Sequence, residues 1–242
     1  DAIGGYIVTP DYSQNDMGVS MQEVLTIVND SHTKNKIVIL DCCHAGFLGS
    51  INSIGQQASI IGDGVTLLTA SKANETAMEV HGHGVFTSLL LEALNGGAAD
   101  VTGYITPGGI YAYIDKALGP WEQRPVFKTN VTRFSPLRRA VPQVGEDILR
   151  KLVDYFTTPD ANFSLDPSFE PTNAPDVSHE IIEPYADTKN TQIFKELQLL
   201  ESVGLVVPYE EEHMYFAAIN SKACRLTSAG QHYWKLVHDN II

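Results

Sequence analysis

The side chains best suited to chemistry gather in the stretch 41–46, which reads Asp-Cys-Cys-His-Ala-Gly. This stretch ends a predicted strand, 36–42, whose centre is continuously apolar, as in a strand buried on both faces. Functional sites of open α/β sheets lie beyond the carboxyl ends of the strands. A thiol here is therefore well placed to act as a nucleophile, while the structural alternative is a buried cysteine pair.

Apolar runs and helix signals alternate through the first 140 residues, and these elements must position the reactive stretch. Ser20 and Glu23 have the spacing of a capping box, and Thr106-Pro107 fits an N-cap followed by a first helical residue. Helices are predicted at 20–28, 86–94 and 106–118, and further strands at 6–8, 65–69 and 125–127. Buried strands that alternate with helices predict a parallel α/β sheet.

A two-proline segment, 135–142, predicts a boundary near residue 140 between two domains, 1–140 and 141–242. The second domain carries 16 acidic and 7 basic residues, a net charge of −9. Its pattern predicts helices at 146–156, 191–203 and 228–238, strands at 205–207, 214–218 and 225–227, and an unstructured stretch at 157–176. This order of elements resembles a winged-helix domain.

The stretch 41–46 resembles the nucleophile motif of the caspase-like cysteine peptidases, in their metacaspase and orthocaspase branch. Further segments resemble that family in the same order along the chain, at 5–11, 68–71, 75–79, 84–87 and 123–127. The resemblance covers about residues 3–140. It implies a partial caspase-like parallel-sheet sandwich, without the N-terminal strands, followed by the small winged-helix α+β domain.

The resemblance also implies roles for single residues. Cys43 would be the nucleophile that forms a thioacyl-enzyme, with Cys42 in a packing role, and His44 and Gly46 would support the motif. Asp41 corresponds to a position that lines the S1 pocket, where a carboxylate favours Arg or Lys at P1. Glu79 is expected to add to this preference, the alternative being an ordinary solvated acid.

A catalytic His is the feature that the resemblance does not locate in this chain. His32, the only His before Cys43, is expected at the opposite end of the sheet, and His81 and His83 fall in a glycine-rich loop. We therefore expect the family's His-Gly segment upstream of Asp1, so that the printed chain is a fragment and inactive by itself. The alternative is a non-catalytic caspase-like scaffold or interaction protein.

Composition narrows the class of partners. A net charge of −13 disfavours nucleic acid, and no apolar run is long enough to span a membrane. Three cysteines, two of them adjacent, fit a reducing cytoplasm. We expect a protein or peptide substrate, a protein partner for the acidic second domain, and no cofactor or metal, with activation by calcium left open.

Overall fold

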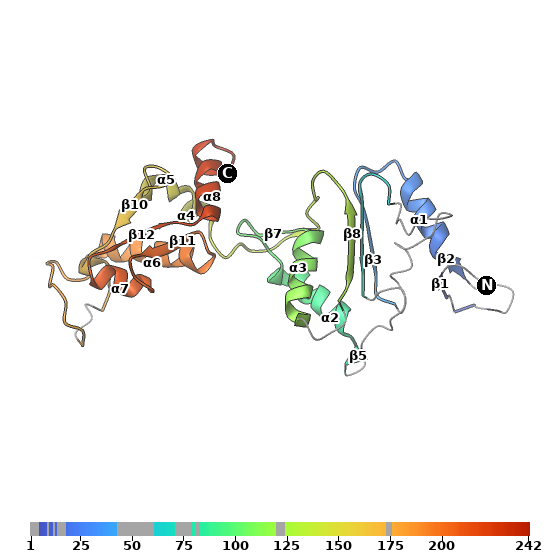
Figure 1. The fold of residues 1–242 in the computed structure, drawn as a ribbon, viewed down its shortest axis with the longest axis horizontal. Helices are drawn as coiled ribbons and strands as arrows, with labels where there is room; N and C mark the ends of the chain where they lie inside the picture. Colours follow the sequence, from blue (N-terminus) through green and yellow to red (C-terminus); the bar gives the residue numbers. More distant parts are fainter. Residues whose placement is uncertain are drawn as a thin grey trace. The chain divides into compact units, whose positions relative to one another are not determined.

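The chain forms mixed α/β structure in two separate units (Figure 1), as described by a computed structural model. The structure describes residues 5–8, 10–11, 13, 18–42, 61–70, 79–80, 83–119, 124–172 and 176–242. One unit comprises Asp1–Val141 and the other Pro142–Ile242, so the division falls beside the two-proline segment of the sequence.

The first unit is built on a three-stranded sheet in the order β3 (Lys36–Leu40), β4 (Val65–Thr69) and β8 (Val126–Asn130). Every residue of β4, the central strand, is buried. Strands β3 and β4 are parallel, as predicted, but β8 is antiparallel to β4. The prediction of a purely parallel sheet was therefore wrong, because two helices rather than one crossover helix connect β4 to β8.

Successive side chains of β4 point to opposite faces of the sheet and hold helices on both sides. Leu67 packs with Met21 and Leu25 of α1 (Met21–Asp30). Leu68 packs instead in a cluster with residues of α2 (Val85–Glu92) and α3 (Pro107–Leu118). The unit therefore has three layers, with the sheet in the middle.

The helix starts follow the sequence signals. The Ser20 hydroxyl accepts the Glu23 N–H at 3.1 Å, and the Glu23 carboxylate accepts the Ser20 N–H at 3.1 Å, which confirms the capping box. Thr106 caps α3 by accepting the Gly109 N–H at 3.1 Å. Helix α2 continues into a π-helical turn, Ala93–Gly97.

Three short strand pairs complete the described part of the first unit. Each is antiparallel and joins strands of two residues. They are β1 (Tyr6–Ile7) with β2 (Val19–Ser20), β5 (Glu79–Val80) with β6 (His83–Gly84), and β7 (Tyr104–Ile105) with β9 (Arg138–Arg139).

The second unit has an antiparallel sheet in the order β10 (Asn162–Ser164), β12 (Ala223–Leu226), β11 (Val206–Tyr209). Its helices are α4 (Glu146–Arg150), α5 (Leu152–Tyr155), α6 (Thr188–Ser202), α7 (Met214–Ile219) and α8 (Ser228–His238), with a 3-10 turn at Pro167–Phe169. Phe194, Leu197 and Leu200 of α6 are buried at every third position and anchor that helix in the core.

Two predictions in this unit were wrong. Residues 214–218 form helix α7 and not a strand, because Met214, Ala217 and Ala218 are buried with the three- and four-residue spacing of a helix. The stretch predicted to be unstructured, 157–176, contains β10 and the 3-10 turn. A three-residue strand is too short for its alternation to stand out from a polar sequence.

No helix in the described ranges is long and apolar enough to cross a membrane.

Candidate functional site

Asp41 lies at the carboxyl end of the parallel strand pair. It directly follows β3, and the Ala70 N–H just after β4 donates to the Leu40 carbonyl at 3.0 Å, so the two strands end side by side. The Asp41 side chain is exposed and turns toward the start of α2, where the Thr87 hydroxyl donates to Oδ2 at 2.6 Å. The hydrogen bond fixes the direction in which this carboxylate points.

Gly84, the N-cap residue of α2, allows the carboxylate to approach the helix. A Cβ placed on Gly84 would lie 2.5 Å from the Asp41 Oδ2 atom, so any other residue at this position would displace the carboxylate. No side chain of Gly84 can cap the helix, so the first turn of α2 leaves its positive dipole end beside an acid.

The backbone brings a second predicted residue to the same place. Glu79 pairs with Gly84 in the short β5–β6 hairpin, and Gly84 contacts Asp41. Asp41 and Glu79, which are expected to contact a basic P1 side chain, therefore belong to adjoining segments. His32 precedes the amino end of β3, with the whole strand between it and Asp41, as expected from the sequence.

Of the two adjacent cysteines, Cys42 lies among the described residues. Cys42 is half-buried and packs against the apolar cluster of Met21, Leu25 and Leu67, as expected of a packing residue. Cys43 lies outside the described residues, as do His44, Gly46 and His81. The described part of the candidate site therefore consists of Asp41, which precedes the motif, and the start of α2 beside it.

The predicted segment 123–127 reaches the same edge of the sheet. Val126, the first residue of β8, pairs with Thr69, the last residue of β4. Phe127 stacks on Tyr111 of α3 with ring centroids 5.0 Å apart, and Arg124 forms an ion pair with Asp115 of α3 at 3.5 Å. These contacts hold the end of α3 against the strand that borders the site.

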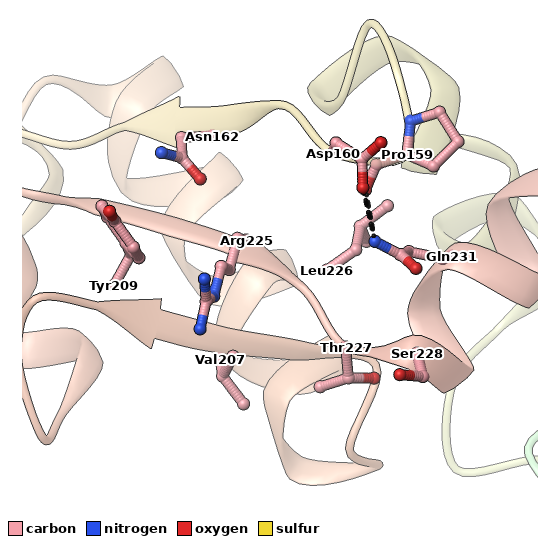
Figure 2. A pocket seen from close by; sticks show the side chains of 10 residues that line it. All are labelled: Pro159, Asp160, Asn162, Val207, Tyr209, Arg225, Leu226, Thr227, Ser228 and Gln231. Atoms are coloured by element: carbon pink, nitrogen blue, oxygen red, sulfur yellow. Dashed lines mark hydrogen bonds between the residues drawn. The ribbon is translucent and has the colours of Figure 1, made fainter.

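A pocket in the second unit was not predicted from the sequence (Figure 2). It has a volume of about 530 Å³ and lies between the open face of the β10-β12-β11 sheet and the start of α8. Arg225 projects from the central strand with its guanidinium 4.9 Å from the centre of the Tyr209 ring. Gln231 donates to the Asp160 carboxylate at 3.0 Å and to the Pro159 carbonyl at 3.1 Å. Its residues come from three stretches of the chain, 159–162, 207–209 and 225–231, so no single motif marks the pocket.

A buried carboxylate of this unit is engaged in the core. Glu196 of α6 accepts hydrogen bonds from Lys151 at 2.7 and 2.8 Å, from Gln192 at 2.9 Å and from the Tyr155 hydroxyl. Burial alone would raise the pKa of Glu196, but these hydrogen bonds hold it below its ordinary value. Burial and the bond to Glu196 raise the pKa of Tyr155. A carboxylate satisfied in this way is structural.

Cys224 of β12 is fully buried, and this burial raises the pKa of its thiol to about 12. It is therefore a poor nucleophile at neutral pH. Among the described residues, no group of three or more His, Cys, Asp or Glu side chains could hold a metal ion.

Comparisons of the chain with protein-family models, curated proteins and solved structures found no match.

Proposed function

We propose that the first unit is a caspase-like cysteine endopeptidase that cleaves peptide bonds after Arg or Lys, with Cys43 as the nucleophile. The observation that supports this proposal best is the setting of Asp41. An exposed carboxylate stands two residues before Cys43, at the carboxyl end of a parallel strand, and is aimed by Thr87 and Gly84. That is the edge of an α/β sheet at which functional sites form.

In the proposed reaction, the Cys43 thiolate attacks the carbonyl carbon of the scissile bond. The C–N bond breaks, the amine leaves with a proton, and the resulting thioester is hydrolysed by water, which frees the thiol. The family resemblance implies that the general base is a His. The Cys43 N–H would contribute to stabilising the oxyanion.

Asp41 accounts for the proposed preference at P1. Thr87 occupies Oδ2, while Oδ1 accepts no hydrogen bond from any described residue. A guanidinium or ammonium at P1 would contact the carboxylate through Oδ1 in a charge-assisted hydrogen bond. Glu79, opposite Gly84 in the hairpin, would add a second negative charge.

We also propose that the second unit is a winged-helix module that binds a regulatory protein partner. The sheet order β10-β12-β11, with α6 directly before β11, supports this topology. Helix α7 lies where a winged helix has an extended wing, which is a departure from the pattern. The net charge of −9 supports a protein partner rather than a DNA duplex.

The test is hydrolysis of matched fluorogenic peptides with Arg, Lys or Asp at P1, with and without calcium. The assay uses the full-length natural polypeptide, because the proposed reaction requires the catalytic His that the family resemblance implies. Cys43→Ala should abolish turnover, and Cys42→Ala is the matched control that should retain it.

Preferential cleavage after Asp would contradict the assigned pocket. Turnover that survives in Cys43→Ala would exclude the assigned nucleophile. No turnover from a polypeptide that contains no upstream His-Gly would support the scaffold alternative.

A further inference from the structure

The pocket of the second unit, which we call the Arg225 pocket, contains a group of polar side chains that the protein leaves unengaged. Within the described residues, no side-chain hydrogen bond or ion pair engages Arg225, Asn162 or Ser228. Figure 2 shows Arg225 flanked by Asn162 on β10 and Val207 on β11, and both are its direct partners across the sheet. The three unengaged side chains come from different elements and line one hollow.

Arg225 is prepared for an anion by the way in which it is held. Its guanidinium carbon lies over the Tyr209 ring, 4.9 Å from the ring centre. The N–H donors lie in the plane of the guanidinium and stay available at its edge, where they match two oxygens of a phosphate or carboxylate. The contact with Tyr209 also restricts the side chain, which lowers the entropy lost when a ligand binds.

The acid that lines the same pocket does not pair with this guanidinium. Asp160 lines the same pocket, but its Oδ1 atom accepts from Gln231 at 3.0 Å, and no ion pair joins it to Arg225. Arg150, the other arginine of the unit, pairs with Glu146 at 3.6 Å. In a unit with 16 acidic residues, an arginine that stays unpaired inside a pocket points to an outside partner.

We infer that the Arg225 pocket binds a small phosphate monoester, an activity separate from the proposed peptidase. A phosphoryl group offers three oxygens in three directions, so Arg225 can bind two of them and Asn162, its direct partner on β10, a third, whereas a carboxylate offers two oxygens in one plane. The volume of about 530 Å³ exceeds the needs of phosphate alone and leaves room for an organic moiety.

The net charge of the second unit favours a small ligand over an extended polyanion. A net charge of −9 repels an extended polyanion along its whole length. A single phosphate group next to Arg225 meets the local positive charge, while the more distant acids are screened beyond about 10 Å at moderate salt. The pocket therefore favours a small monoester over nucleic acid.

The test is titration of the full chain with inorganic phosphate, adenosine monophosphate and adenosine, followed by amide chemical shifts in NMR spectra. We expect saturable binding of adenosine monophosphate with a Kd of about 1 mM or tighter, shifts centred on β12 and the start of α8, and no response to adenosine. Weaker binding of inorganic phosphate at the same amides would assign the contact to the phosphoryl group and the remaining affinity to the organic part.

The variants separate a specific site from general charge effects. Arg225→Gln should weaken binding at least tenfold, and Arg225→Lys should weaken it less, because the charge is kept but the two-pronged donor is lost. Lys235→Gln makes the same change of charge outside the pocket and should bind as the parent protein does. Arg225 is exposed, so the circular dichroism spectrum and melting temperature should not change in its variants.

Three results of the titrations would overturn the inference. They are no saturable binding to the folded chain, an equal loss of binding in Lys235→Gln, and a response to adenosine that matches that to adenosine monophosphate. Tight binding of duplex DNA that Arg225→Gln abolishes would also overturn it, in favour of a nucleic-acid surface.

Discussion

Two carboxylates, Asp41 in the first unit and Glu196 in the second, are held in opposite ways. Asp41 is exposed and accepts one hydrogen bond, from Thr87. The Glu196 side chain is only 7% exposed, and three neighbouring side chains donate to it. An acid with spare acceptor capacity at a strand end can serve a ligand, whereas a fully engaged acid serves the fold. The same chemical group therefore supports two different expectations for mutation.

The largest expected effect is on the exposed acid. Asp41→Asn should lower kcat/KM for a P1-Arg peptide about 100-fold, because a charge-assisted contact worth about 3 kcal/mol is lost. Its free energy of unfolding in urea should change by less than about 0.5 kcal/mol, since the side chain is exposed. Glu196→Gln is the control that should leave kcat/KM unaltered, and an active Asp41→Asn enzyme with unchanged preference would remove Asp41 from substrate recognition.

The buried acid should show the reverse pattern. Glu196→Ala should reduce the unfolding free energy of the second unit by about 2 kcal/mol, because Lys151 and Tyr155 lose their shared acceptor. Urea denaturation followed by circular dichroism measures the change. Glu212→Ala removes the same charge from an exposed turn and should stay within about 0.5 kcal/mol of the parent. Equal losses in both variants would show that net charge, and not the hydrogen-bond cluster, sets the stability.

A smaller effect is expected at the single hydrogen bond that aims Asp41. Thr87→Val keeps the shape of the side chain but removes the donor, so KM for a P1-Arg peptide should rise about tenfold with kcat little changed. Thr87→Ser restores the hydroxyl and should restore KM. A fall in kcat that Ser does not rescue would point to a disturbed α2 start rather than to misdirection of the carboxylate.

The smallest effect is expected on the free energy of unfolding at acidic pH. The pKa of Glu196 is held below its ordinary value of 4.5, so its contribution is present above that value and is lost as pH falls through the lowered pKa. Unfolding free energies measured from neutral pH down into this range should therefore fall more steeply for the parent than for Glu196→Gln. Parallel curves would mean that Glu196 titrates alike in the folded and unfolded chain.

Local signals in the sequence predicted much of the fold. The capping box at Ser20, the Thr106-Pro107 start and strand β4 all follow from residues within one turn or one strand of each other. The direction of β8 could not be predicted in this way, because it depends on how two helices return the chain to the sheet. Helix α7 was missed although its buried residues follow a helical period, because an apolar run this short also suits a strand.

The two candidate sites also differ in how far the sequence could predict them. Asp41 was found because a strand and a reactive stretch are adjacent in sequence, although its contacts with Thr87 and Gly84, more than 40 residues away, were not foreseeable. The Arg225 pocket has no continuous signature, since Asn162, Tyr209 and Arg225 meet only when three strands pair. Sequence motifs reveal sites that one segment dominates, and tertiary structure is needed for the others.

The burial of Cys224 gives the second unit an internal reporter of its own opening. Its thiol lies fully inside the sheet, and the raised pKa of about 12 keeps it protonated in the closed form. An alkylating reagent can modify it only during the moments when the strands separate. The rate at which Cys224 is alkylated therefore measures how often the sheet of the second unit opens.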